Sequence, residues 1–327
     1  MKRRAFLKRS IESAGILAAA RTLAEDKPMS SVASPPPSNA AKIPRRPYGN
    51  QGDHLSIVGF GGIVVTNLEQ DEANRIVAEA VERGVNYFDV APTYGDAEER
   101  LGPALEPYRK NAFLACKTIK RLRKEAEEEF NRSLERLRTD YFDLYQLHGL
   151  ADVQKDVETA FAEGGVMELL LEAKKEGRIH YLGFSAHTEE AAVAAMDRYA
   201  FDSALFPINF ATYYKGNFGP KVIERARKGG VTLLALKALA RQKWPSDDPT
   251  REKYPKCWYQ PLHDPTEADL GLRWSLSQPI AAAIPPGEKP LFRLAMDIAG
   301  RYSPITPEED DKLKALAQTL DPIFQTG

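Results

Sequence analysis

Four side chains that could form one proton-transfer site lie at or just after the ends of successive apolar segments of this sequence. They are Asp89, Tyr94, Lys117 and His148. The hydroxyl of a tyrosine has an ordinary pKa of about 10, which is too high for easy proton exchange near neutral pH. A lysine ammonium beside the hydroxyl lowers that pKa, and an aspartate paired with the lysine keeps the ammonium charged and in place.

A tyrosine tuned in this way can protonate a carbonyl oxygen while a hydride reaches the carbonyl carbon, and a histidine can orient that oxygen by a hydrogen bond. Each of the four residues also has a structural explanation. An aspartate can cap a helix, a lysine can be a solvated loop cation and a histidine can lie satisfied in a core. Their occurrence at consecutive strand ends favours one catalytic site, because adjacent parallel strands lie about 4.8 Å apart.

The segments that must position these residues alternate between short apolar runs and longer runs with apolar residues at helical spacing. The expected strands are residues 56–60, 86–90, 112–116, 142–147, 179–184, 203–206, 231–236 and 280–284. The expected helices are 71–83, 98–108, 125–138, 166–175, 189–199, 220–228, 266–276 and 291–299, with a further helix at 307–320. Eight strand–helix units predict a single α/β domain folded as a (β/α)₈ TIM barrel with an extra C-terminal helix.

A doubly wound open sheet is the alternative architecture. Its usual dinucleotide fingerprint is absent, because residues 59–62 lack the third glycine and its spacing. In a barrel the chemistry lies at the C-terminal ends of the strands, which is where the four candidate residues fall.

The N-terminal segment differs in composition from the rest. Residues 1–24 carry six basic side chains against one acidic side chain, although the whole chain has a formal net charge of -1. Basic, apolar and small residues follow one another in the order typical of an export signal, and the run from Arg3 to Lys8 resembles a bacterial twin-arginine signal. We therefore expect recognition by the twin-arginine export machinery and a periplasmic location. The alternative is the basic N-terminus of a cytoplasmic protein.

Residues 25–47 are rich in proline and predict an extended linker, so residues 48–327 are expected to form the barrel. The mildly acidic remainder gives no electrostatic reason to bind nucleic acid. No run of about 18 uncharged apolar residues predicts stable insertion in a membrane. The two cysteines and five histidines form no ligand-spaced cluster, and we expect no metal site.

The motifs around the four residues resemble the aldo-keto reductases. The resemblance rests on residues 86–95, Lys117, 146–148 and 179–185, and extends over about residues 44–320. It implies NAD(P)H-dependent reduction of an aldehyde or ketone, or oxidation of the corresponding alcohol. By the same resemblance the acid is Tyr94, and NADP is the expected cofactor with NAD as the alternative.

The cofactor side of the resemblance is less complete. The family holds the nicotinamide amide with a Ser-Asn pair and a glutamine, and this chain has Ser185 followed by Ala186. Asn209 or His187 is a candidate substitute. The other predicted cofactor contacts are Gly62, Lys237, Gly287 and Arg293. Arg293, with Lys289, could bind a 2′-phosphate or be a solvated charge at a helix start. Gly62 could serve only to form a tight turn.

Two other functions compete with the enzyme. The first is a nicotinamide-nucleotide-binding module of reductase fold with little turnover. The second is a barrel glycoside hydrolase, which would need two carboxylates about 5 to 9.5 Å apart, whereas only Asp89 is well placed. The aromatic-rich segment 242–265 is expected to be an ordered flap over the site or packing at the barrel rim. The substrate, the direction of reaction and the oligomeric state stay open.

Overall fold

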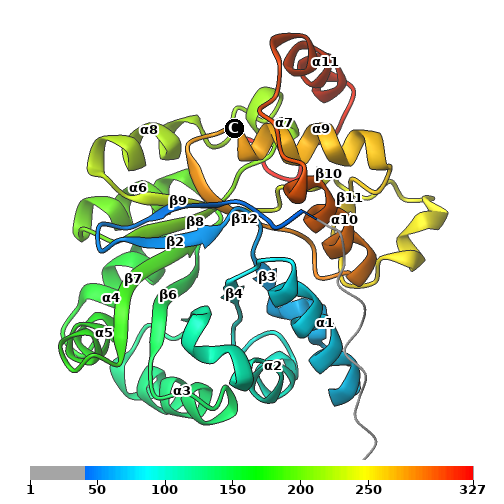
Figure 1. The fold of residues 1–327 in the computed structure, drawn as a ribbon. Coiled ribbons are helices and arrows are strands. Elements are labelled where there is room, and N and C mark those ends of the chain that lie inside the picture. Colours follow the sequence, from blue (N-terminus) through cyan, green and yellow to red (C-terminus); the bar gives the residue numbers. More distant parts are fainter. Residues whose placement is uncertain (1–40, 327) are drawn as a thin grey trace, which may run out of the picture. The chain divides into compact units, whose positions relative to one another are not determined.

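The structure is a computed structural model and describes residues 41–326. Eight parallel strands form one sheet in the order β12-β9-β8-β7-β6-β5-β4-β3. Its strands are β3 (Phe60–Gly61), β4 (Tyr87–Asp89), β5 (Phe113–Thr118), β6 (Phe142–Leu150), β7 (Ile179–Ala186), β8 (Ser203–Pro207), β9 (Thr232–Leu236) and β12 (Ile280–Ile284). The last strand returns to the first, because Val58 pairs with Ala283 in a parallel bridge and Gly59 N–H donates to the Ala283 carbonyl at 2.9 Å. The sheet therefore closes into a barrel (Figure 1).

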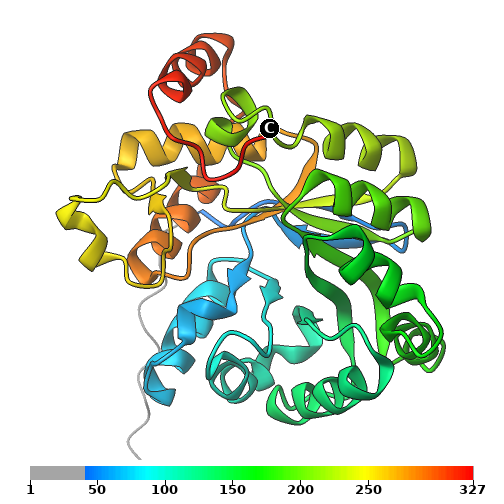
Figure 2. The same ribbon diagram turned by 180° about the vertical axis from the view of Figure 1, so that it is seen from behind.

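Helices surround the barrel, as the view from behind also shows (Figure 2). One follows each strand: α1 (Gln70–Glu82), α2 (Ala97–Leu105), α3 (Arg123–Arg136), α5 (Val166–Lys175), α6 (Glu189–Arg198), α8 (Pro220–Gly229), α9 (Pro265–Leu276) and α10 (Lys289–Gly300). The additional helices are η1 (Gly62–Val65), η2 (Glu106–Asn111), the π-helical η3 (Val153–Glu158), α4 (Thr159–Phe161), α7 (Phe210–Tyr214), η4 (Pro249–Lys253) and the C-terminal α11 (Pro307–Gln318). The predicted (β/α)₈ barrel with an extra C-terminal helix is confirmed.

Helix α1 illustrates how the residue pattern produces these elements. Ile76, Val77 and Ala80 recur at helical spacing and are buried against the barrel, whereas acidic residues face outward. The chain turns at Gly84, whose φ of +96° is accessible to glycine at little cost. The helix thus ends where the next strand must begin.

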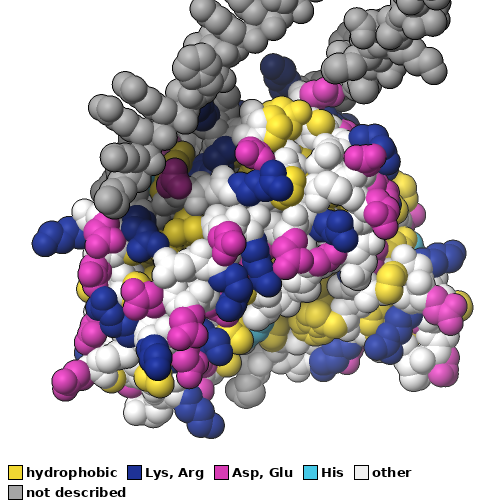
Figure 3. Space-filling view, turned by 90° about the horizontal axis from the view of Figure 1, so that it is seen from below, with side chains coloured by type: hydrophobic (Ala, Val, Ile, Leu, Met, Phe, Trp, Pro, Cys, Tyr) yellow, Lys and Arg dark blue, Asp and Glu magenta, His cyan; other side chains and the backbone are white. Residues whose placement is uncertain are grey.

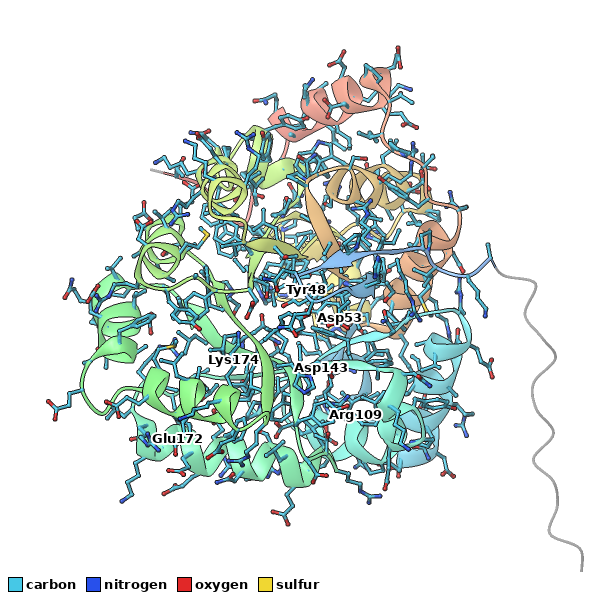
Figure 4. All side chains as sticks on the ribbon, turned by 60° about the vertical axis from the view of Figure 1, so that its left-hand side comes forward. Tyr48, Asp53, Arg109, Asp143, Glu172 and Lys174 are labelled. Atoms are coloured by element: carbon cyan, nitrogen blue, oxygen red, sulfur yellow. The ribbon has the colours of Figure 1, made fainter. Side chains whose placement is uncertain are left out.

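A hairpin that the sequence did not reveal covers the N-terminal end of the barrel. Strands β1 (Arg45–Tyr48) and β2 (Asp53–Ser56) pair antiparallel. Tyr48 is 1% exposed, and its hydroxyl donates to Ser203 Oγ at 2.8 Å. The Tyr181 hydroxyl donates to Asp53 Oδ2 at 2.7 Å. Figure 4 shows Tyr48 and Asp53 near one another at this hairpin.

The hairpin changes the boundary that composition indicated. Ile43 is 4% exposed and its N–H donates to the Arg83 carbonyl at 2.9 Å, so packing against the barrel begins before residue 48. The expected linker therefore does not run to residue 47 as an extended tether. Residues 1–40, which include the expected export signal, lie outside the described residues.

Two layers of apolar side chains hold the barrel together. The larger layer lies between strands and helices, and a smaller one fills the barrel interior with Tyr48, Tyr87, Phe113 and Tyr181 among its members. The aromatic rings of the interior meet edge to face, for example Tyr48 against Tyr181 at 5.1 Å between centroids. The interior is thus a packed core that supports whatever lies at the strand ends.

The outer surface carries charges of both signs. Positive and negative side chains are interspersed on the face shown in Figure 3. Exposed ion pairs such as Arg138–Glu106, at 2.8 Å, contribute little stability one by one. Among residues 41–326, no helix is both long and apolar enough to cross a bilayer.

Candidate active site

The C-terminal ends of the barrel strands surround a cavity of about 310 Å³. Asp89 ends β4, Lys117 and His148 lie near the ends of β5 and β6, and Ser185 lies near the end of β7. Tyr94 reaches the same cavity from the turn that follows β4. The structure therefore brings the four predicted catalytic residues into one cavity, which also contains the predicted cofactor residue Ser185.

A buried ion pair forms the base of this site. Lys117 is 0% exposed and Asp89 2%, and Lys117 Nζ hydrogen-bonds to Asp89 Oδ1. The same Nζ donates to the Val90 carbonyl at 3.2 Å. The other carboxylate oxygen accepts from the Tyr87 hydroxyl and from Gln146 Nε2, each at 3.2 Å. Both ends of the pair are thus held in place by further hydrogen bonds.

The ion pair also determines the charge on the lysine. Burial lowers the pKa of Lys117, but the carboxylate of Asp89 raises it, and the net result lies above the ordinary value. Lys117 therefore stays an ammonium at neutral pH.

Tyr94 lies between this ammonium and His148. Its ring centroid is 5.3 Å from Lys117 Nζ, and its ring meets the His148 imidazole edge to face at 5.7 Å. Burial raises the pKa of the Tyr94 hydroxyl, Lys117 lowers it, and the net pKa is above the ordinary value. From the sequence we expected the lysine to lower this pKa, but the desolvation of the buried hydroxyl raises it by more than Lys117 lowers it. Tyr94 accordingly holds its proton at neutral pH.

His148 is a neutral imidazole. Burial, followed by the charge of Lys117, lowers its pKa to about 3. Its Nδ1 is buried without a hydrogen-bond partner among residues 41–326. A neutral ring with a free polar atom can hydrogen-bond to a ligand without adding a charge to the cavity.

An ion pair outside the cavity positions the end of β6, which carries His148. Arg121 Nη2 donates to the His148 carbonyl at 2.8 Å, and its Nε pairs with Asp156 Oδ1 at 3.1 Å. Asp156 in turn accepts the N–H groups of Ala151 and Asp152 at 2.9 Å. Nothing in the sequence pattern indicated this support, because Arg121 lies before α3 and Asp156 lies in η3, 35 residues further along the chain.

Three of the predicted cofactor residues line the cavity: Ser185, Lys237 and Gly287. Ser185 Oγ accepts the Gly149 N–H at 2.8 Å. At Gly287 an added Cβ would lie 2.3 Å from Ile63 Cγ2, so the turn after β12 can approach η1 this closely only with glycine. Gly287 and Ile63 therefore pack against each other on the cavity wall, and a larger residue at position 287 would push this part of the wall apart.

The other three predicted cofactor residues do not line the cavity. Gly62 is buried, and an added Cβ would lie 2.8 Å from Val90 Cγ2. Asn209 is 0% exposed and caps α7, with its Oδ1 accepting the Thr212 N–H at 3.0 Å. Its Nδ2 has no partner within the described part of the chain.

Arg293 lies on the outside of α10, where it pairs with Glu79 of α1 at 2.7 Å. Lys289 pairs with Glu72 in the same way. Contact of either cation with a nucleotide stays a prediction, and it would require these ion pairs to open.

The segment 242–265 contributes one wall of the cavity. It contains the strands β10 (Ala240–Gln242) and β11 (Gln260–Pro261) at its ends and η4 between them. Lys256 Nζ donates to the carbonyls of Ile63, Val64 and Thr66 at 2.9, 3.2 and 3.0 Å. The Lys256 N–H donates to Glu288 Oε1 at 2.7 Å. The segment is thus tied across the cavity to η1, which agrees with an ordered flap more than with simple packing at the rim.

We did not predict five of the wall residues from the sequence, namely Ile63, Lys256, Cys257, Pro285 and Pro286. His187, which was predicted with Asn209 as a candidate substitute for the amide ligand, also lies on the wall. Only the aromatic content of the segment 242–265 signalled that part of this wall existed. Among residues 41–326, no group of three or more His, Cys, Asp or Glu side chains is placed to hold a metal ion.

Comparison with known proteins agrees with this architecture. The profile of the Aldo/keto reductase family matches residues 58–257. The aldo-keto reductase str7 of Strobilurus tenacellus is 28% identical over 307 residues, or 83% of this chain and 88% of that protein. The oxidoreductase YqkF of Bacillus subtilis is 34% identical over 156 residues, which is 43% of this chain and 48% of that protein. L-galactose dehydrogenase of Arabidopsis thaliana is 32% identical over 179 residues, 48% of this chain and 53% of that protein.

The matched part of this chain thus spans about half the length of the last two relatives. Among solved structures, the holo form of aldo-keto reductase AKR11C1 from Bacillus halodurans has a TM-score of 0.66 at 24% identity, over 85% of this chain and 98% of that chain. The eight-stranded barrel, with its cavity at the C-terminal strand ends, defines the architecture as a TIM barrel. The chain belongs to the aldo/keto reductase family.

Proposed function

We propose that this chain is an NAD(P)H-dependent oxidoreductase that reduces an aldehyde or ketone, or oxidises the corresponding alcohol, with Tyr94 as the general acid. The observation that carries the proposal is the buried Lys117–Asp89 ion pair beside a tyrosine that keeps its proton. A binding protein has no need to hold a charged ammonium beside a phenol in a buried site.

The residues divide the work according to their protonation states. The nicotinamide cofactor, when bound, supplies or accepts the hydride. The neutral imidazole of His148 orients the carbonyl oxygen, and the Tyr94 hydroxyl donates its proton to that oxygen as negative charge develops on it. Lys117 stabilises the phenolate that remains, and Asp89 keeps Lys117 in place.

The chain offers a cradle that suits a dinucleotide. Ser185 presents a buried hydroxyl at the cavity, and Gly287 contributes a wall position without a side chain opposite Ile63. Among the solved relatives one has been determined in a holo form. We propose NADP as the cofactor with NAD as the alternative, and Ser185 and Gly287 as contacts. Lys237, the third predicted cofactor residue on the cavity wall, lies beside Trp258, with its Nζ 5.6 Å from the centroid of that ring. Gly62, Asn209 and Arg293 would take part only if the site rearranged.

The test uses Tyr94→Phe, which removes the hydroxyl and keeps the ring. NADPH and NADH are first titrated against the full chain by quenching of tryptophan fluorescence, and a panel of aldehydes and ketones is then assayed. The variant should lose about 1,000-fold in kcat/KM, because general acid catalysis contributes about 10² to 10⁴. Its Kd for the nucleotide should change by less than about threefold, since the ring packing is preserved.

Tyr108→Phe, at a half-buried position away from the cavity, is the matched control and should behave like the wild type. Equal activity of Tyr94→Phe and wild type would remove Tyr94 as the acid. Nucleotide binding without turnover of any carbonyl would favour the binding module. The hydrolase has no comparable support, because Asp89 is the one carboxylate on the cavity wall within residues 41–326 and it is paired with Lys117.

We also propose that residues 1–24 direct export through the twin-arginine machinery to the periplasm, on the strength of the paired arginines and the segment order. Replacing Arg3 and Arg4 together by lysine should retain the chain in the cytoplasmic fraction. Arg9→Lys is the control and should not change its distribution. Retention of both variants, or export of both, would contradict the proposal.

A further inference from the structure

Lys237 stands apart from the other cations of the active-site cavity. It follows β9 directly and has a φ of +61°, which is uncommon for a residue with a side chain. Its carbonyl accepts the Ala240 N–H at 2.9 Å, which fixes this turn. Its Nζ lies 5.6 Å from the centroid of the Trp258 ring at the cavity mouth. Within residues 41–326, this ammonium makes no ion pair and donates no hydrogen bond.

The other two lysines on the cavity wall are satisfied. Lys117 is paired with Asp89, the one carboxylate that lines the cavity in the described part of the chain. Lys256 is bonded to three carbonyls of η1 and its turn. Lys237 thus leaves an uncompensated positive charge in the cavity. Burial lowers its pKa to about 8, so most of the population is still charged at neutral pH.

The charge of Lys237 lies on the histidine side of the cavity. Burial, followed by Lys237, lowers the pKa of His187 to about 4. Lys237 also helps to lower the pKa of His148, after burial, Lys117 and other cations. Both histidines are therefore neutral and neither competes for an anion. The Lys256 bonds lie elsewhere, at η1 and Glu288.

Aromatic rings complete the wall around this cation. Phe324, from the C-terminal segment, stacks on His187 with centroids 5.8 Å apart and meets Trp258 at 6.1 Å. Trp258 is 56% exposed, which is unusual for so large an apolar side chain. A ligand in the cavity beside Trp258 would meet one positive charge, that of Lys237, in the same cavity as His148, the residue assigned to the carbonyl oxygen.

We propose that Lys237 binds an anionic oxygen group of the molecule in the cavity, and that the carboxylate of a carbonyl substrate supplies this group. The substrate class is then an aldehyde or ketone that also carries a carboxylate. This inference rests on the proposed function. A phosphate of the nucleotide has the same chemistry, and the experiment separates the two sources.

The experiment compares two aldehydes that differ in one charge, 4-carboxybenzaldehyde and its methyl ester, methyl 4-formylbenzoate. The readout is the ratio of their kcat/KM values, because that ratio cancels any general loss of activity. Lys237→Met should lower the ratio at least tenfold, and Lys237→Arg should restore most of it, since the guanidinium keeps the charge. Lys253→Met, an exposed lysine of the same segment, should leave the ratio at the wild-type value.

The nucleotide Kd is measured in parallel for each variant. A Kd for NADPH that rises tenfold in Lys237→Met, with both aldehydes affected equally, would assign the charge to a nucleotide phosphate and overturn the substrate assignment. An unchanged ratio with an unchanged Kd would overturn the anion site altogether.

A third readout does not depend on turnover. Terephthalate, a dicarboxylate of similar shape, is titrated against the full chain while tryptophan fluorescence is followed, with Trp258→Phe identifying the reporting ring. Quenching that Lys237→Met abolishes would support the anion site even if no nucleotide bound and the proposed function failed. Absence of such quenching together with an inactive protein would overturn both.

Discussion

The two ends of the barrel differ in the polar groups that they leave for a ligand. At the N-terminal end, polar side chains from separate segments pair with one another: Tyr48 with Ser203, Tyr181 with Asp53, and Asp143 with Arg109 at 2.9 Å. Asp143 and Arg109 are labelled together in Figure 4. At the C-terminal end, His148 Nδ1 and the Lys237 ammonium lack partners among residues 41–326.

This difference separates stability from function. At the N-terminal end, which the hairpin closes, satisfied hydrogen bonds offset the cost of burying polar atoms, and the hairpin packs stably on the core. At the C-terminal end, which opens into the cavity, polar groups without partners reduce stability and are available to a ligand. We expect substitutions at the closed end to change the free energy of unfolding and substitutions at the open end to change catalysis.

The largest effect is expected for Lys117→Met, which should change both catalysis and the free energy of unfolding. It removes the charge beside Tyr94, so kcat/KM should fall by about 1,000-fold or more. It also leaves Asp89 buried and unpaired, which should cost about 3 to 5 kcal/mol of unfolding free energy. Enzyme assays and urea denaturation measure the two losses.

The double variant Lys117→Met with Asp89→Asn separates them. Removing the stranded carboxylate charge should recover part of the stability and none of the activity. Full stability in the single variant would mean that the ion pair is not a buried, mutually dependent unit.

At the closed end, Tyr48→Ala should lower the free energy of unfolding by about 3 to 5 kcal/mol, because it leaves a cavity in the barrel interior. The activity of the folded fraction should stay within about threefold of the wild type. Tyr48→Phe keeps the ring and loses only the hydrogen bond to Ser203, at a cost of about 1 kcal/mol. Loss of activity in the folded alanine variant would break the separation between the two ends.

A smaller effect is expected where the segment 242–265 is tied to η1. Lys256→Met removes three hydrogen bonds from one ammonium, and the dissociation rate of NADPH should rise about tenfold in stopped-flow fluorescence. The unfolding free energy should change little, since the segment lies outside the core. Lys253→Met serves again as the exposed control. An unchanged dissociation rate would show that these bonds do not hold the nucleotide in.

The smallest effect concerns pH. The ratio of kcat/KM for the carboxylate over its methyl ester should be constant below the pKa of Lys237, about 8, and should fall about fivefold or more as the ammonium loses its proton. Four neighbouring groups do not titrate in that window: His148 and His187 have pKa values of about 3 and 4, burial raises the pKa of Cys257 to about 12, and the pKa of Tyr94 lies above its ordinary value. Burial also lowers the pKa of Lys256, so the same pH profile is recorded for Lys256→Met, which should keep the fall of the ratio.

Lys237→Arg should remove the pH dependence of this ratio, because arginine stays protonated throughout. A wild-type ratio that does not change with pH, or the same fall in the arginine variant, would assign the anion preference to another group.

The eight strands and their helices could be predicted from the sequence because each is a local pattern of apolar residues. Asp89, Tyr94, Lys117 and His148 could be predicted for the same reason, since a strand end is a local feature and parallel strands bring their ends together. The hairpin at 45–56 could not, because its short strands carry charged and turn residues and are held by contacts with residues such as Ser203 and Tyr181, far along the chain.

The predicted cofactor residues also show that contacts between distant parts of the chain cannot be recognised from the sequence. From the sequence, Arg293 and Lys289 were candidate cations for the cofactor near a strand end. In the structure they form ion pairs with Glu79 and Glu72 of α1, and these partners can be recognised only once α1 and α10 are packed together. Asn209 caps α7 through its Oδ1, a role that the sequence did not indicate, and a contact of its unpartnered Nδ2 with the cofactor stays a prediction.

By itself the sequence determined the barrel and the four residues at its mouth, because both follow from the period of apolar side chains along the chain. Only the tertiary structure decided the protonation of Tyr94, the neutrality of His148 and the isolation of Lys237. These depend on how much water is excluded and on which charges lie within a few ångströms, and residues far apart in the sequence supply both.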